Sequence, residues 1–301
     1  MKIKLKSPVP ATILLIILVW SPLLLYFSGC VAVPDQAVVA SGSMNREMHR
    51  QAASCGSALE PEISRLDTGG GLDPAAFTIL SWNSHRSGHK EWNNDLISLG
   101  SGADIILLQE AALDPVLDTQ LNLTANQWLM ATAFNLDDRE IGVMSAARVA
   151  PQAYCVTREP EPLFKIPKIG LAASYPLAGH ETSLLVVNIH IVNYTINVDA
   201  VQRQIGALEH IVRIHEGPVI VAGDFNTWNN EREALVQQKM TDLGMIPVAF
   251  DPDHRVSFFN HKVDGIYYRG LEVMKSLSHQ VNSSDHNPLE VHFRLSEGSS
   301  G

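Results

Sequence analysis

The segment Pro-Val-Ile-Val-Ala-Gly-Asp-Phe-Asn (218–226) places a carboxylate and an amide directly after an apolar, β-branched run. Such an uninterrupted run is typical of a strand that is covered on both faces. A carboxylate is costly to bury, so its place at the end of this strand indicates a role other than packing. Asp224 and Asn226 therefore mark one edge of a buried sheet where functional groups are expected.

Other apolar runs also carry polar groups at one end. If these ends lie along one edge of packed sheets, they line a single cleft rich in oxygen ligands, which suits a hard cation such as Mg²⁺. A His beside an Asp then adds general-base chemistry. The polar groups are Asn83 after 77–82, Glu110 after 103–108, His190 after 183–189, Asp264 at the start of 263–268, and Asp285 with His286 before 287–295.

The order of apolar and helical patterns predicts the fold class. Strands and helices are mixed without strict alternation, which favours an α/β fold with two sheets packed face to face and helices outside. The run 287–295 alternates, as a strand with one solvated face does. Helices are expected over 90–99, 114–123, 198–215 and 230–243, and strands over 77–82, 103–110, 141–145, 183–190, 218–225, 263–268 and 287–295.

In order along the chain, these segments resemble the motifs of the endonuclease/exonuclease/phosphatase family. That family includes DNase I-like nucleases, neutral sphingomyelinases and inositol-phosphate phosphatases, and the resemblance is closest to its bacterial YafD-type branch. It implies a DNase I-like four-layer α/β sandwich, with two packed mixed β-sheets flanked by helices. The matching pieces are S-W-N (81–83), L-L-Q-E (107–110), G-V-M-S (142–145), N-I-H (188–190), G-D-F-N (223–226), V-D-G-I (263–266) and S-D-H-N-P-L (284–289).

The resemblance implies a metal-dependent hydrolase that acts on phosphoesters, and more specifically on a phosphodiester. Mg²⁺ is the expected cofactor, with Mn²⁺ as an alternative. Glu110 is the expected principal metal ligand, with Asn83 and Asp285 close to the metal.

Five further residues receive catalytic roles from the same resemblance. Asp224 is expected to orient or activate the attacking water. Asn226 and His190 are expected to hold the scissile phosphate and stabilise the transition state. Asp264 is expected to pair with His286, so that the imidazole acts as general base or phosphate binder. Metal ions and positioned charges are what phosphoryl transfer requires.

Four of these residues also have an ordinary structural explanation. Glu110 could be a carboxylate at a helix N-terminus, and His190 a hydrogen-bonded core histidine. Asp264 could cap a turn, and Asn226 could simply occupy one. His85, close to the first motif, is expected at the surface rather than among the ligands.

The charge of the chain limits the possible partners. Its formal net charge is −10, which makes it no broad attractor for nucleic acid. DNA or RNA, a phospholipid head group and a small phosphodiester all stay open as substrates, and a monomer is expected. The alternative is a catalytically inactive exported binding or scaffold protein of the same fold. It predicts at least one broken site position, and none is broken.

The first thirty residues predict export. Three lysines and no acidic residue accompany the apolar stretch 11–27, as in a signal peptide or membrane anchor. Phe-Ser-Gly-Cys (27–30) resembles the end of a bacterial lipoprotein signal, in which Cys30 would carry the lipid. A buried core helix is the remaining alternative. Export would place the body in the periplasm or cell envelope, possibly tethered to the membrane.

The rest of the chain divides into three parts. Residues 31–76 are expected to be a linker with a short helix near 45–58, residues 77–295 the catalytic domain, and residues 296–301 a disordered tail. Cys55 and Cys155 could form a disulfide in an oxidising compartment; otherwise Cys155 is a buried thiol in a strand.

Overall fold

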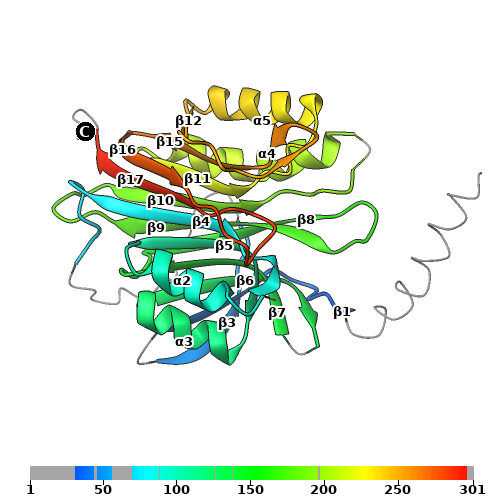
Figure 1. Ribbon diagram of the computed structural model, residues 1–301, viewed down its shortest axis with the longest axis horizontal. Helices are drawn as coiled ribbons and strands as arrows, with labels where there is room; N and C mark the ends of the chain where they lie inside the picture. Colours follow the sequence, from blue (N-terminus) through cyan, green and yellow to red (C-terminus); the bar gives the residue numbers. More distant parts are fainter. Residues whose placement is uncertain are drawn as a thin grey trace, which may run out of the picture.

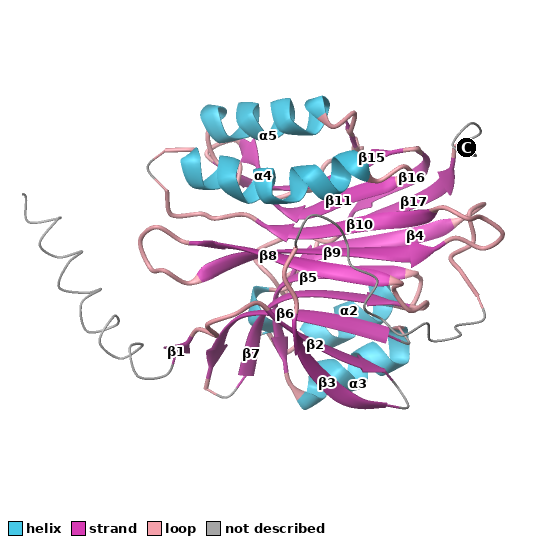
Figure 2. Cartoon of the chain, turned by 180° about the vertical axis from the view of Figure 1, so that it is seen from behind, coloured by secondary structure: helices cyan, strands magenta, loops and turns pink. Residues whose placement is uncertain are grey.

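Two β-sheets pack face to face between two pairs of helices (Figure 1). Figure 2 shows the same four layers from behind, with α4 and α5 on one outer face and α2 and α3 on the other. The four-layer sandwich of two mixed sheets expected from the sequence is therefore confirmed. The helices are α2 (Trp92–Gly100), α3 (Pro115–Thr124), α4 (Asp199–Ile214) and α5 (Asn230–Asp242). The computed structural model describes residues 31–43, 46–55, 70–87, 89–125, 127–137, 139–195 and 197–296.

The larger sheet has nine strands in the order β16-β17-β4-β5-β7-β6-β2-β3, with β1 also paired to β6. Only β4 and β5 run parallel among its pairs, so their carboxyl ends lie at the same edge. The strands are β1 (Val31–Ala32), β2 (Val38–Ser43), β3 (Arg46–Ala52), β4 (Phe77–Asn83), β5 (Ile105–Leu113), β6 (Gln127–Leu136), β7 (Arg139–Ala147), β16 (Leu271–Ser278) and β17 (Leu289–Leu295).

The second sheet has six strands in the order β12-β15-β11-β10-β9-β8. Its central strands β10 and β11 are parallel, and their neighbours are antiparallel. A separate hairpin, β13–β14, precedes β15. The strands are β8 (Ala153–Pro160), β9 (Pro167–Pro176), β10 (Ser183–His190), β11 (Val219–Asp224), β12 (Ile246–Pro247), β13 (Ser257–Phe258), β14 (His261–Lys262) and β15 (Asp264–Arg269).

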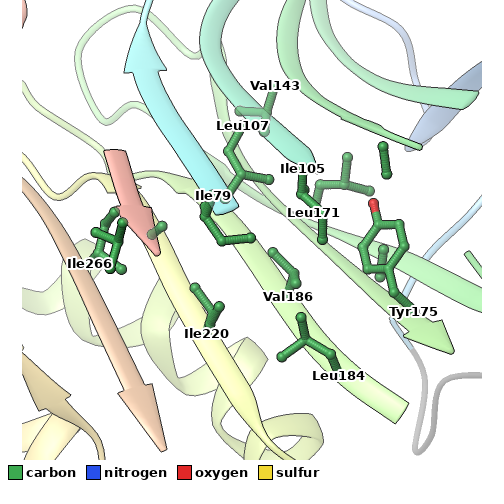
Figure 3. Close-up of a cluster of buried hydrophobic side chains, with 14 of the residues drawn as sticks. Ile79, Ile105, Leu107, Val143, Leu171, Tyr175, Leu184, Val186, Ile220 and Ile266 are labelled. Atoms are coloured by element: carbon green, nitrogen blue, oxygen red, sulfur yellow. The ribbon is translucent and has the colours of Figure 1, made fainter. Parts of the chain in front are cut away.

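The main core lies between the two sheets. Figure 3 shows side chains of both inner faces meeting there. The removal of these apolar side chains from water is the main free-energy gain that favours packing of the two sheets. The central strands are apolar because each also has a helix layer behind it. Residues of the larger sheet in this core include Ile79, Ile105, Leu107 and Val143, and those of the smaller sheet include Leu171, Leu184, Val186, Ile220 and Ile266.

The interval 31–76 differs from the expected linker. Its described part adds β1, β2 and β3 to the larger sheet, so the short helix expected near 45–58 is wrong. The reason is tertiary pairing: β2 lies against β6 and buries Val39 and Ala40. Cys55 forms a disulfide with Cys155 of β8, which ties this segment to the opposite sheet.

Residues 1–30 and the last five residues lie outside the described part of the chain, and with them the expected export signal or anchor and most of the expected tail. Within the described residues, no helix is both long enough and apolar enough to cross a bilayer.

Candidate active site

Strand ends from both sheets meet at one edge of the sandwich. Pairing sets His190 beside Asp224 and Asp224 beside Asp264, across the neighbouring strands β10, β11 and β15. From the other sheet, the Nδ2 of Asn83 donates to the Oδ2 of Asp224 over 3.0 Å. All four side chains are buried. The strand-end groups predicted from the sequence to converge therefore lie side by side.

A buried Asp-His pair forms the base of the site. The Oδ2 of Asp264 lies 2.8 Å from the Nδ1 of His286, so the expected pairing of these two residues is present. This bond fixes the ring with Nε2 left for other partners. Asp224 lies next to this pair. One carboxylate oxygen each from Asp224 and Asp264 and one ring nitrogen of His286 all lie within 4.8 Å of one another.

His190 lies between an acidic and a basic partner. Its Nε2 is 3.4 Å from the Oδ2 of Asp224 and 2.7 Å from the Nζ of Lys168, at the start of β9. An ammonium group has only donors, so Nε2 accepts from Lys168 and the ring proton is on Nδ1. The helix residue Gln204 donates to the backbone oxygen of His190 over 2.8 Å and holds the end of β10 in place.

Glu110 reaches the site through an irregularity in β5. The register of β5 against β7 shifts between Leu108 and Ala111, and Glu110 has a φ of +50°. A bulge of this kind re-aims a side chain at the edge of a sheet. The partly exposed carboxylate lies 3.5 Å from the Nε of Arg86 and 4.0 Å from the Nζ of Lys168.

Asp285 lies at the exposed rim rather than in the buried group. Its Oδ1 is 2.9 Å from the Nδ1 of His85, and the backbone N–H of His85 donates to the Oδ1 of Asn83 over 3.2 Å. His85 is exposed, as expected, but it contacts both Asp285 and Asn83. It is therefore part of the exposed edge of the site.

The G-D-F-N segment contains two residues with positive φ, Gly223 and Asn226. Gly223 has a φ of +144°, and a Cβ there would lie 1.9 Å from the backbone oxygen of Ile189. Only glycine permits this close approach of β11 to β10. Asn226 has a φ of +49°; its N–H donates to the Oδ1 of Asp224, and its Nδ2 donates to the backbone oxygen of Ile191.

Left-handed backbone conformations concentrate here. Non-glycine residues seldom adopt positive φ, and clusters of them are typical of functional sites. Of the eight described examples, four belong to site segments and two more to the β13–β14 hairpin beside His286. The four are His85, Arg86, Glu110 and Asn226, and the two are Phe259 and Asn260.

The charges of the buried groups are coupled. Burial raises the pKa of Asp224 to about 6, against the lowering effect of His286. Burial lowers the pKa of His286, but the charges of Asp264, Asp224 and Asp285 and the Asp264 hydrogen bond raise it to about 10. Burial, with the charges of Lys168 and His286, lowers the pKa of His190 well below its usual value. At neutral pH, His286 is therefore a cation and His190 is neutral.

Two groups of side chains could hold a metal ion. Glu110 and Asp285 offer accessible carboxylate oxygens, and Asn83 offers an amide oxygen, which is the donor set that Mg²⁺ prefers. Asp224, Asp264 and His286 form the second group, but His286 is protonated at neutral pH because its pKa is about 10, and a protonated imidazole is not a metal ligand. By the chemistry of their donor atoms, the oxygens of Glu110, Asp285 and Asn83 therefore suit Mg²⁺ better.

The structure adds functional groups that the sequence did not single out. Lys168 and Arg86 bring two positive charges to Glu110 and the buried cluster, where an anionic substrate would gain from them. Nothing in the local sequence marks Lys168, because one lysine at the start of a strand is ordinary. Glu140 at the start of β7 does not join the site, since its carboxylate accepts from Arg50 and Thr132.

Comparison with known proteins gives a family match over the whole site. A model described as Endonuclease/Exonuclease/phosphatase family matches residues 80–286. A UPF0294 protein of Vibrio vulnificus is 34% identical over 284 residues, covering 91% of this chain and 95% of that protein. A UPF0294 protein of Yersinia pseudotuberculosis is 37% identical over 217 residues, covering 72% and 83% respectively.

Solved structures share the architecture at low sequence identity. An endonuclease/exonuclease/phosphatase from Beutenbergia cavernae gives a TM-score of 0.59 at 15% identity, covering 73% of this chain and 72% of that one. ANGEL2, a 2′,3′-cyclic phosphatase solved with adenosine-2′,3′-vanadate, gives 0.54 at 15% identity, covering 75% and 97%. These likenesses concern the fold.

Proposed function

The chain belongs to the endonuclease/exonuclease/phosphatase family, and we propose that it is a Mg²⁺-dependent phosphodiesterase. The observation that carries this proposal is the convergence of Asn83, Asp224, Asp264, His190 and His286 at one sheet edge, with Glu110 beside them. We also propose the YafD-type branch as its place within the family.

We propose that the metal binds at the rim. Glu110 would hold it, with Asp285 and Asn83 close by, and Mn²⁺ could replace Mg²⁺ there. A bound divalent ion supplies charge that neutralises the phosphate oxygens. Arg86 and Lys168 already place positive charge beside Glu110, which supports the same anionic substrate.

The buried residues divide the remaining work. Asp224, whose pKa is raised to about 6, accepts a proton from water and orients it. His286, held by Asp264 and protonated because its pKa is about 10, donates to a phosphate oxygen. Of the two expected roles of His286, this charge state favours phosphate binding. His190 and Asn226 position the phosphate from the other side.

We propose that the protein works outside the cytoplasmic membrane, in the periplasm or cell envelope. The apolar stretch 11–27 after three lysines supports export, and a lipid on Cys30 would tether the body. The Cys55–Cys155 disulfide also supports this location, since such bonds persist in oxidising compartments. The protein is proposed to act as a monomer.

A substrate panel tests the proposal. A chain starting at Val31 retains every described contact, including Cys55, and would be assayed with Mg²⁺, Mn²⁺ or EDTA. The panel holds DNA, RNA, a 2′,3′-cyclic nucleotide, phospholipids and a chromogenic phosphodiester, with His286→Ala as the paired variant. Metal-dependent cleavage that this variant lacks is expected. Metal-independent cleavage, or equal rates for both proteins, would refute the assignment, and no cleavage would favour the inactive binding protein.

A further inference from the structure

Large apolar side chains are exposed around the mouth of the site. We call them the apolar rim: Leu163 (68% exposed), Phe164 (43%) and Tyr194 (57%) on one side, and Phe258 (45%) and Phe259 (82%) on the other. Single exposed apolar residues are ordinary, but a group of them beside a site marks an interaction surface.

The first half of the rim is attached to the His190 side of the site. Leu163 and Phe164 lie in the β8–β9 loop, which leads to Lys168, and the Phe164 ring is 5.3 Å from that of Tyr194. The buried carboxylate of Glu161 accepts the backbone N–H of Tyr194 over 3.0 Å and so holds both loops together. Figures 1 and 2 show these loops at the same end of the sheets.

The second half is attached to His286. Phe258 and Phe259 lie at the tip of the β13–β14 hairpin, and the Phe258 ring is 6.4 Å from the imidazole of His286. The hairpin is anchored because the Oγ1 of Thr227 donates to the backbone oxygen of Lys262 over 2.5 Å. Both halves are therefore fixed to residues of the active site.

The conformation and exposure of the hairpin tip are unfavourable in the protein without a partner. The two-residue turn has φ values of +48° at Phe259 and +69° at Asn260, where turns of this kind prefer Asn-Gly. A phenylalanine there has an unfavourable backbone and also exposes nearly its whole ring to water. Both costs are offset if the ring is buried by a partner.

We propose that the apolar rim docks the active site onto the surface of a phospholipid bilayer, so that the substrate is the phosphodiester head group of a membrane lipid. This rests on the proposed function. In the hydrolysis, the oxygen of water forms a new bond to phosphorus, one ester P–O bond breaks, and the released alcohol oxygen takes a proton.

Three observations favour a lipid surface over a nucleic acid. Leu163 has no π-face on which a base could stack. Lys165 is exposed beside Phe164, and apolar tips next to a lysine are typical of segments that lie in the interface of an anionic membrane. The apolar stretch 11–27 would keep the body close to a membrane.

Vesicle binding tests the rim independently of catalysis. The chain starting at Val31 would be sedimented with phosphatidylglycerol vesicles, as wild type and as the double variant Leu163→Ser/Phe259→Ser. We expect the apparent Kd of the variant to rise about tenfold or more. The matched control is Ile246→Ser, because Ile246 is 54% exposed but pairs with Tyr268, at the far end of β15 from Asp264. It should bind vesicles as the wild type does.

The rate on vesicle phosphatidylglycerol, divided by the rate on a water-soluble chromogenic diester, links the rim to the substrate. This ratio should fall at least tenfold in the double variant and stay constant in Ile246→Ser. An unchanged Kd and ratio would overturn the docking surface. So would variant effects confined to single-stranded oligonucleotide binding or to dimer formation. Rim-dependent vesicle binding with no cleavage of any diester would contradict the proposed function, and with it the lipid substrate, but would leave the docking surface standing.

Discussion

At the scale of single residues, Asp224 carries a charge that its surroundings disfavour. Burial raises its pKa to about 6, whereas an unfolded aspartate titrates near 3.8. Above pH 6 the folded state therefore holds an ionised group at a cost in stability. Such a cost is typical of a group retained for its chemistry.

Replacing this charge should separate activity from stability. Asp224→Asn is expected to lower kcat about 10²- to 10⁴-fold, the usual effect of losing a proton-transfer group. The free energy of unfolding at pH 7.5 should stay at or above that of the wild type, because the buried charge is gone. Steady-state kinetics and urea denaturation measure the two quantities. A variant that is both active and less stable would contradict the role given to Asp224.

Lys168 is expected to control the charge state of His190. The Lys168 ammonium, 2.7 Å from Nε2, helps to lower the pKa of His190. Lys168→Met should raise that pKa towards 6.5, and Lys168→Arg should leave it low. NMR titration of the imidazole in EDTA reports the pKa directly. Identical titrations for the wild type and Lys168→Met would exclude this coupling.

At the scale of secondary structure, the irregular end of β5 is what turns Glu110 into the site. The apolar run 103–108 predicts the strand, and L-L-Q-E places the carboxylate at its end, but the strand continues to Leu113. The positive φ of Glu110 and the register shift of β5 accompany its pairing with β7. That pairing is a long-range contact, so the local sequence pattern could not predict it.

The difference between local patterns and long-range pairing also explains which elements could be predicted from the sequence. The four helices and the central strands agree with expectation to within a few residues, because their periodicity and burial are local properties. β2 and β3 could not be found this way, since a polar segment such as Arg46–Ala52 becomes a strand only when β2 offers it an edge. Lys168 approaches His190 only through the register of β9 and β10.

The Cys55–Cys155 disulfide joins the segment after β3 to β8 across 100 residues of chain. Cys55→Ser/Cys155→Ser should lower the free energy of unfolding by about 2–5 kcal/mol, because the unfolded chain regains freedom. Urea denaturation with and without dithiothreitol tests this, and reductant should change only the wild type. Equal stability of both proteins without reductant would contradict the prediction.

His215 at the end of α4 should make stability depend on pH. Its Nε2 lies 2.9 Å from the backbone oxygen of Ser183, and burial lowers its pKa below the 6.5 of an unfolded histidine. The unfolded state therefore binds more protons, and stability is lost as pH falls below about 6.5. Replacing one such histidine changes the slope of the free energy of unfolding against pH by at most about 1.4 kcal/mol per pH unit.

Chemical denaturation between pH 5 and pH 7.5 measures this slope. His215→Gln, which keeps a donor for Ser183, should show a shallower acid loss than the wild type. Some loss should persist, because His190 has the same sign of shift. An unchanged slope would mean that His215 binds protons equally in the folded and unfolded states, and would contradict the lowered pKa.

At the scale of the whole molecule, one edge of the sandwich collects nearly all of the unusual chemistry. The buried Asp-His group, the partly exposed Glu110, most of the described left-handed residues and the apolar rim lie there. The rest of the described chain is an ordinary sandwich that holds these groups in place.

The most direct measurement is the rate of hydrolysis of a chromogenic phosphodiester as Mg²⁺ is titrated into wild type, Glu110→Gln and Asp264→Asn. We predict saturable, EDTA-sensitive activity for the wild type. Glu110→Gln should need at least tenfold more Mg²⁺, because a metal ligand is weakened. Asp264→Asn should lose rate at an unchanged metal requirement. Activity without metal, or a normal Mg²⁺ requirement in Glu110→Gln, would contradict the proposed site.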